Sequence, residues 1–236
     1  MKKLALLSLF AVLFFTIAAN AATLYFYAGD FDPNNPNANG LANENDAIVG
    51  GNPYGAATYQ NFVAGGAISV VGLFTNNLSQ LTPTAGYWEV RSGVSEGNGG
   101  LLIASGTASG GNFLQTATGR SGFGYTEYTD AVQFADLSGK LTVNTKYWFA
   151  VVPICTTCNG RSFNSNTFGL NKIGTDMDNL QFFNSSFFGA NYTNANNQGV
   201  FQDFSSGVLT IPEPSSILML GTGLIAVAGA VRRRLL

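Results

Sequence analysis

Short apolar runs separated by glycine-rich turns fill the middle of this chain, and this pattern constrains the fold more than any other feature. No stretch of the middle has three or more turns of helical periodicity with capping residues. In the run YWEVR, residues 87–91, Trp88 and Val90 would face one side while Tyr87, Glu89 and Arg91 face the other. Such alternation is typical of a half-buried strand. The pattern therefore predicts an all-β domain.

A series of short strands is predicted along the middle segment. The expected strands cover residues 23–27, 67–74, 87–91, 101–105, 125–134, 147–152, 181–183 and 208–211. Glycine-rich clusters such as SGVSEGNGG, SGTASGGN and TGRSGFG lie between them and are interpreted as turns. The architecture that fits these strands is an antiparallel β-sandwich, with the jelly roll as one arrangement of it.

A long polar segment, residues 28–56, follows the first predicted strand. It is dense in Asn, Pro and Gly, so we expect no regular element in it. A segment of this length inside a compact domain is usually a functional or ligand-holding loop.

Oxygen-bearing side chains near the two ends of this segment form a candidate metal site. They are Asp30, Asp32, Asn34, Glu44 and Asp46. Oxygen ligands of this kind can converge on calcium, although residues 35–46 match an EF-hand loop only loosely. The alternative is a turn-rich loop that is capped by its own side-chain hydrogen bonds. Apart from calcium, we expect no cofactor.

The charge of the middle segment excludes several partners. Five of the eleven basic residues lie in the two ends of the chain, so residues 22–210 carry twelve acidic and six basic residues. A domain with this net negative charge has no electrostatic footprint for nucleic acid or for an anionic membrane.

The chain has no histidine. This absence removes Ser-His-Asp and Cys-His nucleophiles, histidine-ligated zinc and the commonest general base. Carboxylates are still able to act, and glycoside hydrolysis needs two of them roughly 5–9.5 Å apart. The linear spacing singles out no pair among Glu89, Glu96, Glu127 and Asp130. We expect no enzymatic activity.

Two cysteines, Cys155 and Cys158, follow the predicted strand at residues 147–152. A structural zinc site usually has four ligands, and the chain has no further cysteine or histidine to complete one. A redox-active pair normally begins a helix, whereas this pair follows a strand. In an exported protein the expected outcome is a small structural disulfide that shapes its loop and adds little to global stability.

Aromatic residues gather late in the middle segment. They are Phe182, Phe183, Phe187, Phe188, Tyr192, Phe201 and Phe204. Aromatics at strand positions more often belong to a core, so we expect these to fill the sandwich interior. The alternative is an exposed platform on which sugar rings stack.

The first 21 residues have the features of a secretory signal peptide. Two lysines precede an apolar stretch, and Ala19-Asn20-Ala21 forms a cleavage site of the A-x-A type. We therefore expect a signal helix at residues 1–21, export of the chain, and a β-sandwich ectodomain over residues 22–210.

The chain closes with a proline-bracketed glutamate, an apolar run and three arginines. Residues 215–231 carry no charge and would span about 25 Å as a helix, the short end for crossing a bilayer. The cluster Arg232, Arg233 and Arg234 would stay on the cytoplasmic side. Pro212 and Pro214 impose extended backbone around Glu213, which gives a processing enzyme an accessible strip outside the membrane.

These three parts, in this order, resemble the PEP-CTERM sorting signal that exosortases read. The resemblance covers residues 211–236 and implies a Gram-negative source and an inner-membrane intermediate. It also implies cleavage by an exosortase near Pro212-Glu213-Pro214, and delivery to the cell surface or an exopolysaccharide matrix. Through YWEVRSG, LLIASG and YWFAVVP, the middle segment is also similar to jelly-roll-like ectodomains of the same group, a likeness that identifies no ligand.

Three functions are compatible with the sequence. The first is a non-enzymatic exported protein, processed by an exosortase, with a structural or adhesive role at the surface or in the extracellular matrix. The alternative is a carbohydrate-binding module for exopolysaccharide. The third, with least support, is a secreted hydrolase that uses two carboxylates.

Overall fold

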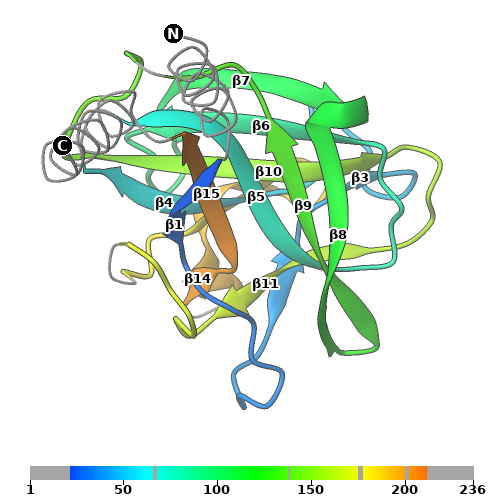
Figure 1. Ribbon diagram of the computed structural model, residues 1–236. Coiled ribbons are helices and arrows are strands. Elements are labelled where there is room, and N and C mark those ends of the chain that lie inside the picture. Colours follow the sequence, from blue (N-terminus) through cyan, green and yellow to red (C-terminus); the bar gives the residue numbers. More distant parts are fainter. Residues whose placement is uncertain (1–21, 66–67, 138, 175–177, 200–201, 212–236) are drawn as a thin grey trace, which may run out of the picture.

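Apolar side chains that alternate along the strands bring two β-sheets together face to face in the computed structural model (Figure 1). The structure describes residues 22–65, 68–137, 139–174, 178–199 and 202–211. The predicted signal peptide at residues 1–21 and the predicted membrane helix at residues 215–231 lie outside these ranges. Within them, no helix combines the length and apolar character needed to span a bilayer.

One sheet contains eight strands within the described residues. They are β1 (Thr23–Tyr27), β2 (Gly40–Ala42), β5 (Ser69–Ser79), β8 (Phe113–Gly122), β9 (Tyr125–Gln133), β11 (Ser162–Thr167), β14 (Asp203–Phe204) and β15 (Ser206–Ile211). Strand β5 is central, because it pairs with β9 along one side and with β15 and β11 along the other. Strand β1 extends the sheet beyond β15, and β8 extends it beyond β9.

The second sheet contains seven strands of the described chain. They are β3 (Asn45–Asp46), β4 (Ala57–Ala64), β6 (Ala85–Ser92), β7 (Leu101–Ser109), β10 (Thr145–Cys155), β12 (Phe182–Ser185) and β13 (Ala190–Asn194). They lie in the order β13-β12-β4-β10-β6-β7, and β3 pairs in parallel with the end of β10. The described part of the chain also has two short 3₁₀ turns, η2 (Gly110–Asn112) and η3 (Ala195–Gln198).

The prediction of an all-β fold with two antiparallel sheets is confirmed, and every predicted strand overlaps an observed one. The sheets together hold more than the eight strands of a simple jelly roll. On β6, Trp88 and Val90 face the interior while Tyr87 lies on the outer side, as the alternation predicted.

The prediction that residues 28–56 contain no regular element is wrong. Strands β2 and β3 lie in this segment, and Glu44 bridges to Ala56. Both strands are short, and their partners β11 and β10 come more than a hundred residues later in the chain. The clusters SGTASGGN and TGRSGFG were likewise interpreted as turns, whereas the first five residues of each belong to β7 and β8 respectively. In all these places tertiary pairing overrides a local composition that is typical of loops.

The space between the sheets is apolar at one end of the sandwich. Val70 and Leu73 of β5 face Phe62 of β4 and Phe149 of β10 across this space. Aromatic rings pack edge to face here, with the centroids of Phe62 and Phe149 5.8 Å apart. This part of the interior is held by burial of apolar surface.

At the other end, the space between the sheets is polar and hydrogen-bonded. Asn43 is fully buried, and its amide donates to Asn77 Oδ1 of one sheet and to the Val151 carbonyl oxygen of the other. Its own Oδ1 accepts from the Thr58 backbone N–H. Asn164 connects the sheets in the same way, since its amide donates to Thr58 Oγ1 and Ser206 Oγ. Buried amides therefore join the two sheets at this end.

Replacing Asn43 by alanine should destabilise the fold strongly. The change removes the partner of Asn77 Oδ1 and of the Thr58 N–H, and it leaves the Val151 carbonyl with Thr75 Oγ1 as its remaining side-chain partner. Each buried polar group that loses its partner costs roughly 1–3 kcal/mol. We expect a decrease of about 3 kcal/mol in the free energy of unfolding, measured by urea denaturation. The control Asn191→Ala removes one exposed hydrogen bond and should change stability by only about 0.5 kcal/mol. Equal effects of the two variants would contradict this account of the interior.

Candidate functional site

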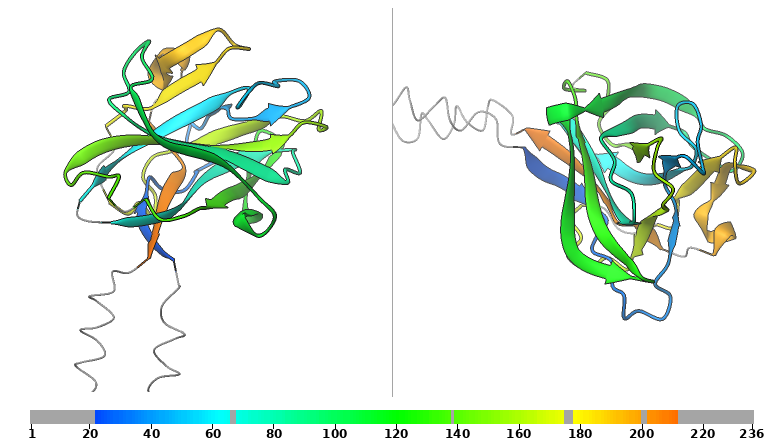
Figure 2. Two further views of the ribbon diagram at one scale, coloured as in Figure 1. Left: turned by 90° about the horizontal axis from the view of Figure 1, so that it is seen from above. Right: turned by 90° about the vertical axis from the view of Figure 1, so that its right-hand side faces the viewer.

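The first and last described strands pair with each other. Thr23 of β1 lies opposite Thr210 of β15, and Ile211 of β15 lies opposite Ser69 of β5. Figure 2 shows β1 in blue and β15 in orange side by side at one end of the molecule. We call this end, defined by Thr23, Ser69 and Ile211, the tail end.

The opposite end of β5 carries a pocket. Leu78 lies nine residues beyond Ser69 on β5, a separation of about 30 Å for an extended strand. It pairs with Phe163 of β11 on one side and with Glu127 of β9 on the other. A pocket beside Leu78 is therefore far from the tail end.

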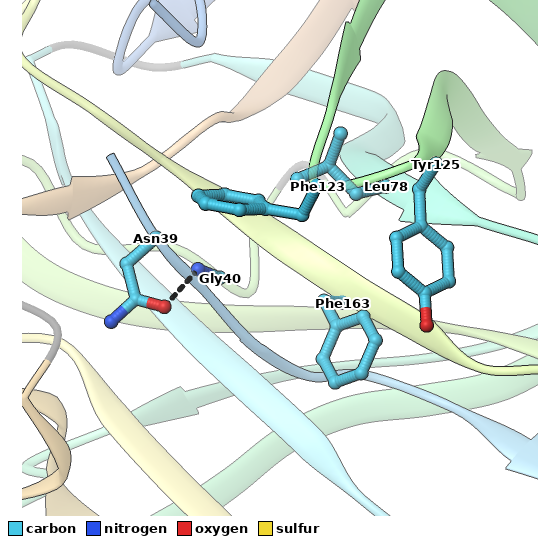
Figure 3. Close-up of a pocket in the computed structure, with 6 residues that line it drawn as sticks. All are labelled: Asn39, Gly40, Leu78, Phe123, Tyr125 and Phe163. Carbon is cyan, nitrogen blue, oxygen red and sulfur yellow. Dashed lines mark hydrogen bonds between the residues drawn. The ribbon is translucent and has the colours of Figure 1, made fainter. Parts of the chain in front are cut away.

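Three aromatic rings and one amide surround this pocket, which has a volume of about 210 Å³ (Figure 3). The residues that line it are Asn39, Gly40, Leu78, Phe123, Tyr125 and Phe163. The rings of Tyr125 and Phe163 meet edge to face with centroids 5.5 Å apart. We call this set the aromatic pocket. Its residues come from β5, β9, β11, the start of β2 and the β8–β9 turn.

Phe123 is the most exposed ring of the aromatic pocket and has an unusual backbone. It is 65% exposed, and its φ is 55°. Together with Gly124, at φ 83°, it forms the two-residue turn between β8 and β9. Positive φ at both positions is the pattern of a type I′ turn, in which Asn-Gly is favoured and a bulky first residue is an outlier. The position costs stability, of order 1 kcal/mol or more.

The ring of Phe31 packs against the ring of Phe123. Their ring centroids lie 6.4 Å apart, and Phe31 itself is buried. The backbone of Gly122 approaches the Phe31 ring so closely that a Cβ there would lie 2.8 Å from it. The absence of a Cβ at Gly122 therefore allows the turn to pack directly against Phe31.

The charges around the aromatic pocket are paired with one another. Arg120 contacts Glu127 through Nε at 2.5 Å and Asp30 through Nη1 at 2.7 Å. Burial opposes ionisation of Asp30, but hydrogen bonds from Tyr27 and Asn171 and the charge of Arg120 outweigh it, so the pKa of Asp30 lies below its ordinary value. These groups form a network within the protein.

A second ion pair lies behind Phe163. Arg161 stacks its guanidinium 4.9 Å from the centroid of the Phe163 ring and contacts Glu44 Oε1 at 2.7 Å. Glu44 also accepts a hydrogen bond from the Ser162 backbone N–H. The charge nearest this ring is thus neutralised by a buried carboxylate.

The structure does not gather the five residues of the calcium hypothesis. Asp30 and Glu44 are engaged by different arginines, as described above. Asp32 caps the Asn34 backbone N–H, and Asp46 caps the Ile48 and Val49 N–H groups. In the described ranges, no group of three or more carboxylate or cysteine residues is placed to hold a metal ion. The geometry of Asp32 and Asp46 fits the alternative of a loop capped by its own side chains.

The acidic residues considered for hydrolysis lie in separate environments. Glu89, on the outer side of β6, accepts hydrogen bonds from Tyr59, Tyr87 and Arg91. Glu127 belongs to the Arg120 network, whereas Asp130, three residues along β9, faces the polar interior and accepts from Asn77 and Gln115. Glu96 caps the Asn194 backbone N–H.

The predicted disulfide is present between Cys155 and Cys158. It closes a tight turn at the end of β10, where the Cys158 N–H donates to the Cys155 carbonyl. The Cys158 carbonyl in turn accepts from the Ala47 N–H, next to β3. The bridge therefore shapes the place where β3 meets β10.

Most described members of the late aromatic cluster are buried, but they do not fill the sandwich interior as expected. Phe182 and Tyr192, for example, pack with Tyr87 on the outer side of the second sheet. The buried members of the cluster are Phe182, Phe183, Tyr192 and Phe204. Phe187 and Phe188 are exposed, at 55% and 44%, and Phe201 lies outside the described residues. The aromatic pocket was missed by the sequence analysis because Phe123 stands inside TGRSGFG. A phenylalanine between two glycines at a turn was the available signal.

Comparison with protein families identifies one segment. The family described as the PEP-CTERM protein-sorting motif matches residues 210–234. This match confirms the resemblance drawn from Pro212-Glu213-Pro214 and Arg232 to Arg234, all of which lie outside the described residues. No curated protein and no solved structure matches the chain.

The stability of the fold should depend on pH through Asp130. Burial raises the pKa of this carboxyl to about 7, and the amides of Asn77 and Gln115 only partly offset the effect. The folded state therefore holds a proton that the unfolded chain releases near pH 4, so the contribution of Asp130 to stability is greatest below pH 4 and falls as pH rises towards 7.

We expect wild type to lose about 4 kcal/mol relative to Asp130→Asn between pH 4 and pH 8, because only wild type must ionise a buried carboxyl. Urea denaturation of both proteins across this range measures the difference. Parallel pH profiles would contradict the assignment.

Proposed function

We propose that this protein acts at the cell surface or in an exopolysaccharide matrix, in a structural or adhesive role, after processing by an exosortase. The PEP-CTERM motif at residues 210–234 marks the chain as an exported protein that an exosortase processes. The surface or matrix location, and the non-enzymatic role, are the parts that we add.

The observation that carries this proposal is the position of β15. The strand is held between β1 and β5, and its last residue, Ile211, directly precedes Pro212 of the sorting motif. Cleavage near the motif would therefore leave both sheets complete. A domain that survives removal of its sorting segment suits a protein that passes through the inner membrane as an intermediate and is then released.

A non-enzymatic role is supported by the placement of the carboxylates. Glu89 and Glu127 are each bound by an arginine and lie on the outer sides of different sheets. Asp130 faces the interior. This arrangement gives the third function, a two-carboxylate hydrolase, the weakest support.

The second candidate function is a carbohydrate-binding module for exopolysaccharide. It is favoured by the exposed ring of Phe123 in the aromatic pocket, because aromatic faces provide stacking surfaces for sugars. The two candidates are compatible, since an adhesive matrix protein needs a contact with the matrix.

Replacing Pro212, Glu213 and Pro214 with alanine should block sorting in the native host. Without the rigid, extended strip the exosortase loses its recognition site, so we expect an unprocessed C-terminus and retention in the inner membrane. Mass spectrometry of the C-terminus and cell fractionation measure these outcomes.

The control replaces Pro33 and Pro36, exposed prolines of the loop before β2, with alanine. It should be processed and located as wild type. If the triple variant has the same C-terminus and location as wild type, the sorting proposal is contradicted.

A further inference from the structure

We infer that the aromatic pocket binds a single pyranose ring of a neutral glycan, with Phe123 as the stacking surface. This inference rests on the proposed function, because it names the matrix partner of an adhesive protein. It assigns that role to the β8–β9 turn and not to the late aromatic cluster.

The size of the pocket limits the ligand. Pockets for drug-sized molecules have volumes of roughly 300–1,000 Å³. The aromatic pocket, at about 210 Å³, is smaller and suits one sugar ring of a chain, with the neighbouring rings outside in solvent.

The chemistry of the lining fits a pyranose. Such a ring presents apolar C–H groups on its faces and hydroxyl groups at its edge. The electron-rich face of an exposed aromatic attracts C–H groups and removes them from water. Phe123 provides that face, and Phe163 and Tyr125 close the site from other strands (Figure 3).

Polar groups for the ring edge are also present. The side-chain Oδ1 of Asn39 accepts from the Gly40 N–H at 2.8 Å, and the side-chain amide donates to the Gly199 carbonyl at 3.3 Å. In Figure 3 the amide nitrogen of Asn39 lies on the side away from the three rings, and its oxygen lies towards Gly40. The Tyr125 hydroxyl can both donate and accept. A few fixed polar groups beside aromatic rings are typical of sites that orient a small ligand.

The charges favour a neutral ligand. An anionic sugar would be expected to find an arginine or lysine that is ready to pair with it. Near this pocket Arg161 is paired with Glu44, and Arg120 with Glu127 and Asp30. Binding an acid there would require breaking one of these pairs.

The strained backbone of Phe123 is an independent observation. The first position of a type I′ turn favours Asn or Gly, yet a bulky ring occupies it and remains 65% exposed. Neither the turn nor the core needs a phenylalanine with this exposure. A residue that costs backbone energy and leaves its ring in water is well explained by a contact that the ring makes with a ligand.

The test uses the full chain in detergent micelles and the methyl glycosides of glucose, galactose and mannose as probes. Saturation-transfer NMR titrations should detect saturable binding of at least one of them. The variant Phe123→Asn should weaken that binding by about tenfold or more, the loss of one stacked ring. Its melting temperature should equal or exceed that of wild type, because Asn-Gly suits the turn. If Phe123 had a structural role alone, Phe123→Asn would lower the melting temperature and leave sugar binding unchanged.

The matched control is Phe187→Asn, which removes a similarly exposed ring outside the pocket and should bind as wild type. Absence of binding by all three probes, or unchanged binding in Phe123→Asn, would overturn the inference. Tighter binding of methyl glucuronide than of methyl glucoside would overturn its neutral character. Sorting is measured separately, so a failed sugar titration with normal processing rejects the pocket alone, and failed processing with normal binding rejects the sorting proposal alone.

Discussion

The hydrogen bonds of Asn43 across the gap between the sheets are the interaction on which the rest of this structure depends. They join Val151 of one sheet to Asn77 of the other at the end where the buried side chains include many polar ones. The interior therefore changes along β5, from Val70 and Leu73 near the tail end to Thr75 and Asn77 near the aromatic pocket. Hydrogen bonds are directional, so we infer that they fix the relative position of the sheets beneath the pocket more narrowly than apolar packing would.

This division of the interior explains which strands could be predicted. The stretch at residues 147–152, for example, was predicted correctly as a strand. Every second residue of it lies in the apolar cluster between the sheets. Strand β11 reads SFNSNT and β2 reads GLA, and neither has a local signal. Their place is set by partners distant in the chain, such as Asn164 with Thr58, and a single sequence does not reveal such pairs.

The candidate sites differ in the same way. The sorting motif is contiguous, so its order and spacing could be recognised from the sequence, and the family comparison agrees. The aromatic pocket is formed by residues from β5, β9, β11, the start of β2 and one turn. No pattern within a short stretch of the sequence therefore predicts it. The residues of the calcium hypothesis show the same dependence on distant partners, because Asp30 forms an ion pair with Arg120 and Glu44 forms one with Arg161.

The topology also determines how a pull on the C-terminal end of β15 would be resisted. The last described strand, β15, leaves the sandwich at the tail end and runs antiparallel to β5, whose far end reaches the aromatic pocket. If a ligand at the pocket and the chain beyond Ile211 were pulled apart, β15 would slide along β5 and β1. Such shear loads the hydrogen bonds of β15 to β5 and of β15 to β1 at the same time. It does not break these hydrogen bonds one after another. Because β15 is held between β1 and β5, both ladders resist a pull on its C-terminal end.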